Sequence, residues 1–286
     1  MSDKRTTIDV PNVGALTVAT HVDGDPYISG WIELGNIFEP HILRVLTRFL
    51  GPGDRFLDVG GNLGWFAMIG SRLVGDSGHV DAIEPDPDNY RLLVRNLRDN
   101  GCRNVRTWQG GAGEQSGCVA LYRSEENRGD HRIAAVPIPG RKTVTVPIRS
   151  VDAHLRWNRR VDTALIDTQG SEVHIFRGMR KVLRRNPLMR IIFEYWPHGL
   201  ENCGSTTLEL AGIVKQHGWR LWLLDDGTRE IAADDLVQLA KHDFTPASGR
   251  HADVVALSLR DEAAVEFMRH EENSHPLQSV CVPGEL

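Results

Sequence analysis

The first chemical feature of this sequence is a glycine-rich turn between two apolar runs. Four residues give the turn its character, an acid, two glycines and an amide: Asp58, Gly60, Asn62 and Gly64. The second apolar run, over residues 79–83, leads directly into Glu84. An apolar strand, a glycine-rich turn that opens a helix, and a second strand ending in a carboxylate are how an α/β sheet holds an adenosine-containing cofactor.

The spacing within this turn favours S-adenosylmethionine over a nicotinamide dinucleotide. A dinucleotide site needs G-x-G-x-x-G, whereas Gly60 and Gly64 are separated by three residues that include no glycine at the required position. The carboxylate of Asp58 would repel a pyrophosphate and suits a cationic amino group. Glu84 is placed to accept hydrogen bonds from both ribose hydroxyls. For the turn alone, a plain loop rich in Asp, Gly and Asn is the alternative.

The elements that must position these residues alternate between strands and helices. A lead helix over residues 39–50 has apolar residues at helical spacing and ends at Gly51-Pro52-Gly53. The pattern then predicts three strands and two helices, in the order strand 55–59, helix 63–74, strand 79–83, helix 87–99 and strand 104–108. This βαβαβ order predicts parallel strands joined by right-handed crossovers.

The second half of the chain resumes the alternation after a short β excursion over residues 117–123 and 143–148. The predicted elements are strand 162–167, helix 172–185, strand 188–196, helix 206–217, strand 219–224 and a last strand 252–259 that could return antiparallel. We therefore predict an α/β fold, a three-layer, doubly wound and mostly parallel sheet that is buried on both faces.

Composition and charge narrow the class of protein. The chain has 286 residues, is 41% hydrophobic and carries a formal net charge of -5. That length and hydrophobic content are enough for one α/β domain with additions. A negative net charge provides no basic field for a polyanion, so we do not expect nucleic acid as a bulk partner.

Cysteine usage and hydropathy predict the compartment. The four cysteines form no C-x-x-C pair and have no regular spacing with histidine, so we expect no structural zinc site. No apolar segment follows the polar residues 2–7, and no run approaches the roughly 18 apolar residues of a membrane helix. We expect a cytoplasmic protein without a membrane partner.

The ordered motifs resemble the FkbM family of class I S-adenosylmethionine-dependent methyltransferases. The resemblance extends from about residue 35 to residue 196. It rests on Phe38-Glu39-Pro40, Pro52-Gly53-Asp54, residues 56–64, Glu84-Pro85-Asp86-Pro87, Asn127-Arg128-Gly129, residues 167–172 and Ile192-Phe193-Glu194. It implies a Rossmann-like, seven-stranded methyltransferase domain over residues 36–260, with an N-terminal extension over 1–35 and a C-terminal helix and tail over 261–286.

The resemblance also implies a set of cofactor-binding residues. It places Glu39 over the mouth of the cofactor site, where this residue could hold the amino group or close the pocket. The turn at residues 109–112 lacks the acid that many class I methyltransferases use on adenine. The predicted cofactor-binding residues are Glu39, Asp58, Gly60, Asn62, Gly64, Glu84, Pro85, Asp86 and Ala112.

Three further residues are candidates for catalysis. A sulfonium methyl is already a good electrophile, so the protein must align a nucleophile, and an alcohol nucleophile benefits from a nearby base. Ligands gather beyond the carboxyl ends of the strands, which selects Asp167 and Glu194, and His198 follows closely. Each has an alternative: Asp167 could cap the next helix, Glu194 could pair with a buried arginine, and His198 could be an idle loop histidine.

The predicted function is O-methylation of a hydroxyl on a small natural product or sugar, with S-adenosylmethionine as cofactor. N-methylation of a small-molecule amine is one alternative, and a non-catalytic S-adenosylmethionine-binding protein is another. A metal-dependent enzyme could use Asp167, Glu194 and His198 as ligands. Glu172 is left open between binding the cofactor amine, contacting substrate and capping its helix. The expected partner is a small-molecule acceptor, and a homodimer is an option.

Overall fold

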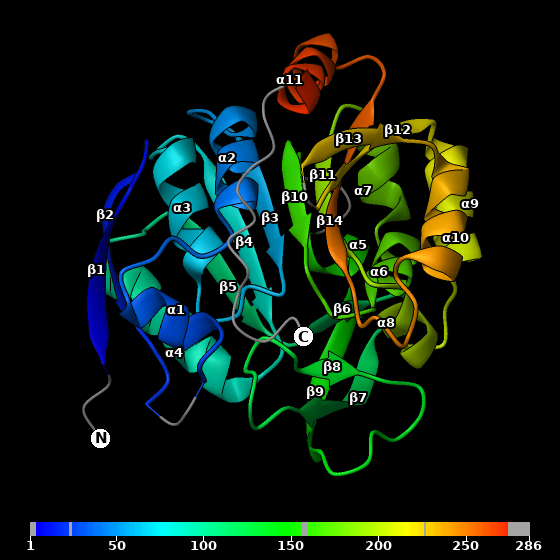
Figure 1. The fold of residues 1–286 in the computed structure, drawn as a ribbon. Coiled ribbons are helices and arrows are strands. Elements are labelled where there is room, and N and C mark those ends of the chain that lie inside the picture. Colours follow the sequence, from blue (N-terminus) through cyan, green and yellow to red (C-terminus); the bar gives the residue numbers. More distant parts are fainter. Residues whose placement is uncertain (1–3, 23–24, 156–159, 226, 274–286) are drawn as a thin grey trace.

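A mixed eight-stranded sheet runs through the middle of the molecule in this computed structural model, which describes residues 4–22, 25–155, 160–225 and 227–273 (Figure 1). The order of strands across the sheet is β13-β12-β14-β11-β10-β3-β4-β5. These strands are β3 (Arg55–Val59), β4 (His79–Glu84), β5 (Val105–Gln109), β10 (Thr163–Ile166), β11 (Arg190–Tyr195), β12 (Trp219–Leu224), β13 (Thr228–Ile231) and β14 (Ala252–Ser258).

The strand order reverses direction between β3 and β10. From β3 the chain builds outward to β4 and β5, then crosses back to place β10 on the other side of β3 and β11 beyond it, all in parallel. Such a reversal creates the crevice in which open α/β sheets bind ligands. The turn after β3 and the residues after β10 therefore face the same crevice.

The last strand returns antiparallel, as the sequence predicts. β14 inserts between β11 and β12 and runs antiparallel to both. The sheet differs from the predicted seven strands by one, because β13 folds back on β12 as an antiparallel edge strand. The alternation of apolar runs with helical segments does not reveal so short a hairpin strand.

Helices cover both faces of the sheet (Figure 1). One face packs against α2 (Pro40–Phe49), α3 (Trp65–Val74), α4 (Pro87–Asp99) and α11 (Glu262–Asn273). The other face packs against α5 (Val151–His154), α6 (Glu172–Gly178), α7 (Arg180–Arg185), α9 (Thr207–His217) and α10 (Ala233–His242). The predicted three-layer sandwich is thus confirmed.

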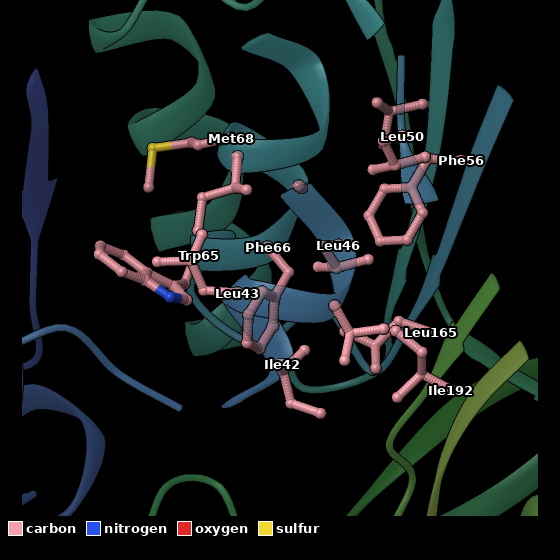
Figure 2. Close-up of a cluster of buried hydrophobic side chains, with 14 of the residues drawn as sticks. Ile42, Leu43, Leu46, Leu50, Phe56, Trp65, Phe66, Met68, Leu165 and Ile192 are labelled. Atoms are coloured by element: carbon pink, nitrogen blue, oxygen red, sulfur yellow. The ribbon is translucent and has the colours of Figure 1, made fainter. Parts of the chain in front are cut away.

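Helix α2 shows how one face of the core is built. Its apolar residues recur at helical spacing, and Ile42 and Leu46 are fully buried. Figure 2 shows these side chains among Phe56, Leu165 and Ile192, which come from three adjacent strands. Successive side chains of β3 point to opposite faces of the sheet. Phe56 therefore packs in this cluster, whereas Leu57 packs in the cluster on the other face.

The N-terminal segment packs against α4. It comprises the hairpin of β1 (Arg5–Val10) and β2 (Gly14–Ala19) and the short helix α1 (Ile28–Glu33). The buried side chain of Asn96 on α4 accepts a hydrogen bond from the Ala19 amide at 2.8 Å and donates to the Ala19 carbonyl at 3.0 Å. One buried asparagine therefore acts as a substitute backbone partner for the end of β2.

A second, four-stranded sheet lies at one end of the main sheet (Figure 1). It contains β6 (Gly111–Gly113), β7 (Gly117–Arg123), β8 (Arg132–Ile133) and β9 (Lys142–Ser150), which confirms the predicted β excursion. The amide of Gly110 donates to the carbonyl of Glu84 at 3.0 Å. This small sheet therefore begins at the carboxyl ends of the main strands, where the candidate site lies.

The single helix predicted over residues 172–185 is wrong, because the structure contains two helices there. The backbone of Met179 (φ -119°) leaves the helical region between α6 and α7. The carboxylate of Asp152 then accepts hydrogen bonds from the amides of Lys181 and Val182, which starts the second helix. In the described part of the chain, none of the helices has the length and apolar character of a membrane span.

Candidate active site

The turn after β3 brings the ends of β3 and β10 into close contact. The amides of Gly60 and Gly61 both donate to the carbonyl of Ile83 at 2.9 Å, which ties the turn to β4. Gly60 has a φ of +94°, and a Cβ atom there would overlap the carbonyl oxygen of Asp167. Only glycine fits this position, because it alone lacks a Cβ and tolerates the left-handed backbone.

Asn62 links the turn to the end of β4. Its backbone is left-handed (φ 46°), and its amide donates to Oε2 of Glu84 at 2.8 Å. Gly64 follows with a φ of +91° and begins α3 close to the backbone of Leu93. The predicted residues Gly60 and Asn62 therefore share one structural task, which is to aim backbone amides at the end of β4, whereas the amide of Gly64 closes the turn by donating to the carbonyl of Gly61 at 2.7 Å.

Glu84 is a buried carboxylate with backbone donors on both oxygens. Only 4% of the residue is exposed. Oε2 accepts from the amide of Asn62 and Oε1 from the amide of Asp86, each at 2.8 Å. Burial raises the pKa of Glu84 to about 8, and these two amides oppose the shift. Each oxygen keeps a further lone pair, so the group can accept hydrogen bonds from a diol.

Asp58 is more isolated than Glu84. It is 1% exposed, and its Oδ2 has no hydrogen-bond partner in the part of the chain that the structure describes. Burial, together with the negative charge of Asp167, raises the pKa of Asp58 to about 7. A buried acceptor without a donor is costly, and a cationic ligand would compensate it.

Asp86, Pro85 and Ala112 lie farther along the same edge. The Asp86 carboxylate caps α4 by accepting from the amides of Asp88 and Asn89, and it lies 2.7 Å from the Arg123 guanidinium. Its oxygens are therefore engaged with the protein, and its predicted contact with a cofactor stays a prediction. Pro85 lies next to β6, which contains the buried Ala112.

Asp167 and Glu194 are joined by a side chain that the sequence did not single out. The Nε2 amide of Gln169 donates to Oδ1 of Asp167 at 3.1 Å and to Oε1 of Glu194 at 2.9 Å. Gln169 holds a left-handed backbone (φ 55°), which is unusual for a residue other than glycine. The only sequence signal for this role was its place in the turn after strand 162–167.

Glu194 lies among acids. It is 5% exposed, and its Oε2 has no hydrogen-bond partner among the described residues. Burial raises its pKa well above the usual range. The nearby carboxylates raise it further, in the order Asp167, Glu172, Asp253 and Glu39. The alternative that Glu194 pairs with a buried arginine is wrong for the residues that the structure describes, because Gln169 is its bonded partner.

Asp253 is a second site residue that the sequence did not indicate. It lies on β14 directly opposite Glu194 in the antiparallel register, and its carboxylate contacts Nε2 of His41 at 2.7 Å. Burial raises the pKa of Asp167 to about 6, with the charge of Asp253 adding to the shift. Only the insertion of β14 beside β11 brings these acids together, and no local motif reports it.

Glu39 reaches the same group of acids from α2. It precedes the helix with a left-handed backbone (φ 45°), and its charge acts on Glu194. Four non-glycine residues of the described chain have positive φ, and three of them, Glu39, Asn62 and Gln169, lie at this site. Backbone strain of this kind costs about 1–3 kcal/mol per residue and collects where function demands it.

Glu172 has a structural task that resolves part of its open assignment. Its Oε1 accepts from the amide and hydroxyl of Thr168 at 3.1 and 2.9 Å and from the amide of Gly170 at 3.3 Å. These bonds hold the loop that presents Gln169. Helix α6 has Ser171 as its N-cap residue, so the alternative that Asp167 caps this helix is wrong.

His198 lies near the acids without bonding to them. It is the second residue of α8 (Pro197–Asn202) and lies edge-on to the ring of Trp196, with centroids 5.8 Å apart. The loop of Gly170 packs directly on Gly199, so α8 borders the site. Within the described residues, no hydrogen bond joins His198 to Asp167 or Glu194. Its catalytic role stays a prediction.

The small sheet covers the site from the other side. The carbonyl of Arg128, in the loop before β8, accepts from the side-chain amides of Asn62 at 3.4 Å and Asn89 at 3.1 Å. The guanidinium of Arg132 stacks on the ring of Trp196, 4.4 Å from its centroid. The small sheet is thus attached both to the turn after β3 and to the segment that follows Glu194.

The polar side chains at the site determine which ligands it can bind and what chemistry it can perform. In the described ranges, no group of three or more histidines, cysteines or acids has the arrangement of a metal site, so Asp167, Glu194 and His198 do not form one there. The site instead offers a diol acceptor at Glu84, a buried acceptor at Asp58, and a pair of acids joined by an amide. Such a site can hold a ribose and a cation and can accept a proton.

Comparison with known proteins points to one family. Residues 58–229, more than half of the chain, match the family described as "Methyltransferase FkbM domain". A protein-L-isoaspartate O-methyltransferase from Methanothrix thermoacetophila is 37% identical over 71 residues, covering 24% of this chain and 34% of that protein. A probable cobalt-precorrin-6B C(15)-methyltransferase from Sulfurisphaera tokodaii is 25% identical over 178 residues, covering 54% of this chain and 88% of that protein.

The match with the isoaspartate methyltransferases spans about a third of their length. Among solved structures, the chain is similar to an FkbM methyltransferase from Methylobacillus flagellatus KT, with 16% identity, a TM-score of 0.45, and coverage of 71% of this chain and 43% of that chain. It is also similar to fibrillarin from Aeropyrum pernix with bound S-adenosyl-L-methionine, with 15% identity, a TM-score of 0.41, and coverage of 90% and 98%.

Proposed function

The chain belongs to the FkbM methyltransferase family, which makes S-adenosylmethionine its cofactor, and we propose that it methylates a hydroxyl group of a small molecule. The observation that carries the proposal is the set of buried carboxylates at the ends of β3, β4 and β11. When bound, the cofactor supplies an electrophilic methyl group on a cationic sulfonium. The residues of the site fit such a ligand because several buried carboxylates offer hydrogen-bond acceptors and negative charge to a cation.

On the cofactor side, we assign the ribose to Glu84 and a cationic group to Asp58. Glu84 is held in place by two backbone amides, so both of its oxygens are oriented before a ribose arrives. Preorganised acceptors of this kind bind a diol without the cost of ordering a side chain. Asp58 offers its unpaired Oδ2 to the amino group.

On the acceptor side, we assign proton acceptance to Glu194. Its Oε2 is unpaired, and its raised pKa makes it a stronger proton acceptor than an ordinary carboxylate. Gln169 fixes Oε1 and thereby orients the carboxylate. His198 is the second candidate for the base, and the absence of a bond to the acids within the described residues favours Glu194 over it.

The class of acceptor is inferred from the family resemblance. The family resemblance points to a natural product or sugar of secondary metabolism. Between β8 and α8 the guanidinium of Arg132 stacks on the buried ring of Trp196 beside the site. N-methylation of an amine is the second candidate, because unpaired carboxylates also attract a protonated amine.

Methyl transfer from a deuterated cofactor tests the proposal. The protein would be incubated with S-adenosylmethionine carrying a CD₃ group and with pairs of sugars that differ only in bearing a hydroxyl or an amine at one carbon. Mass spectrometry should locate the CD₃ group on oxygen. A CD₃ group found on nitrogen would favour the second candidate, and cofactor binding without transfer to either series would contradict the acceptor class.

A further inference from the structure

The pair of acids joined by Gln169 has a feature that the proposed function does not use. The two hydrogens of one side-chain amide lie against Asp167 Oδ1 and Glu194 Oε1, at 3.1 and 2.9 Å. A neutral amide orients both carboxyl groups, but it neutralises neither. Whatever charge the pair carries must therefore be balanced by a proton or by a bound cation.

We propose, on the basis of the proposed function, that Glu194 carries a proton in the free protein and releases it when the sulfonium of S-adenosylmethionine binds. Binding of the cofactor would then convert Glu194 from an acid that cannot act as a base into a carboxylate that can. Gln169 is the positioning residue of this unit, because it holds Glu194 against Asp167.

The surroundings of Glu194 supply the first argument. Four carboxylates act on it, each from a different place in the fold: Asp167 from the end of β10, Glu172 from α6, Asp253 from β14 and Glu39 from the residue before α2. The basic groups that act on these acids in the described part of the chain include His41, whose Nε2 lies 2.7 Å from Asp253, and His251, whose charge acts on Asp167. So many acids at short range cannot all ionise together.

The burial of Glu194 supplies the second argument. The residue is 5% exposed, and its Oε2 lies beyond the reach of water and of any donor in the described chain. A charged oxygen in that position would be left without compensation, whereas a protonated one costs far less. Glu194 is the second-last residue of β11, and ligands of open α/β sheets bind beyond the carboxyl ends of the strands.

The proton balance closes over one catalytic cycle. On cofactor binding, the O–H bond of Glu194 breaks and the proton passes to solvent. During transfer, Glu194 accepts the proton of the acceptor hydroxyl while the new O–CH₃ bond forms and the S–CH₃ bond breaks. The product S-adenosylhomocysteine has an uncharged thioether, so Glu194 is left protonated beside a neutral ligand, as in the free protein.

A pair of ligands isolates the effect of the sulfonium. S-adenosylmethionine and S-adenosylhomocysteine share the adenosine and amino-acid groups and differ in the methyl group with its positive charge. Calorimetry at pH 7 in buffers of different ionisation enthalpy counts the protons released on binding. We expect about one more proton to be released with S-adenosylmethionine than with S-adenosylhomocysteine.

Three variants sharpen the test. Glu194→Gln, which keeps the shape of the side chain, should abolish the difference between the two ligands. Gln169→Asn favours the same left-handed backbone but is too short to bridge both acids, so it should reduce the difference. Glu201→Gln changes an exposed acid on α8 and should preserve it.

Two results would overturn the proposal. Equal proton release with the two ligands in the unmodified protein would mean that no group senses the sulfonium. An undiminished difference in folded Glu194→Gln protein would mean that another acid does. Failure to bind either ligand would contradict the proposed function itself, and the two failures are therefore distinguishable.

Discussion

The ends of strands β4 and β11 carry the same residue in opposite circumstances. Glu84 and Glu194 are 4% and 5% exposed, and both lie within the last two residues of apolar strands of the same sheet. Glu84 receives a backbone amide on each oxygen. Glu194 receives one side-chain amide, from a strained loop, and keeps one oxygen unpaired among the described residues.

The difference shows how the surroundings give one residue type two different roles. Backbone donors are fixed by the turn and the helix start, so Glu84 keeps its orientation and serves as a rigid acceptor of hydrogen bonds. A single side-chain donor and several neighbouring acids leave the proton affinity of Glu194 dependent on what binds beside it. The first arrangement suits binding and the second suits proton transfer.

The largest expected effect concerns the β11 side of the comparison. Glu194→Gln should lower turnover by about 10²–10⁴-fold, because an amide cannot accept the acceptor's proton. Affinity for S-adenosylmethionine should change little. Rates measured at saturating cofactor, with Glu201→Gln as the control, test this. His198→Ala should lower turnover less than Glu194→Gln does, and the reverse order would transfer the role of base to His198.

The next effect concerns the β4 side. Glu84→Ala should weaken binding of S-adenosylmethionine and S-adenosylhomocysteine equally, because both share the ribose. Each charge-assisted hydrogen bond lost is worth about 1.5–3 kcal/mol, partly offset by water that reaches the ribose. Titration calorimetry on the folded variant measures this directly. Unchanged affinity for both ligands would remove Glu84 from the ribose site.

The free energy of unfolding of the ligand-free protein should depend on pH because buried acids at this site have raised pKa values. The pKa of Glu84 is raised to about 8 and those of Asp58 and Glu172 to about 7, so between pH 6.5 and 8 the folded protein keeps protons that the unfolded chain has lost. Stability should therefore fall as the pH rises through this window, by about 1.4 kcal/mol per unit for each proton retained.

We restrict this prediction to pH values above 6.5 because below that pH the buried histidines make stability rise with pH instead. Burial lowers the pKa of His131 to about 4, so raising the pH from 4 to 6.5 favours the folded state. Thermal unfolding followed from pH 6.5 to 8 should show a decreasing midpoint, and Glu84→Gln should flatten the decrease. A midpoint that rises over this range would contradict the acidic character of the site.

The smallest expected effect concerns Glu39, the residue before α2, whose charge acts on Glu194. Glu39→Gln should weaken binding of S-adenosylmethionine by about 0.2–1 kcal/mol, since one partly exposed charge is removed from a site for a cation. The melting temperature of the free protein should change less than the affinity does. A loss of stability with normal affinity would instead assign Glu39 to the start of α2.

The sequence by itself determined the features that depend on residues close together in the chain. The apolar periods predicted the strands and most of the helices, including α2, since burial on one side or both leaves a period that can be read directly. The turn from Asp58 to Gly64 and the position of Glu84 follow from the requirements of a strand, a tight turn and a helix start. These arrangements form within a few residues or within one βαβ unit.

Only the tertiary structure decided what surrounds Glu194. Its partner Gln169 lies 25 residues away in sequence, and Asp253 comes opposite it because β14 inserts between β11 and β12. Neither contact leaves a local pattern, because antiparallel register and loop strain are set by the packing of whole elements. The added strand β13 and the division between α6 and α7 were decided in the same way. The acids that make Glu194 responsive to a bound cation are gathered by strand order, which no short stretch of sequence encodes.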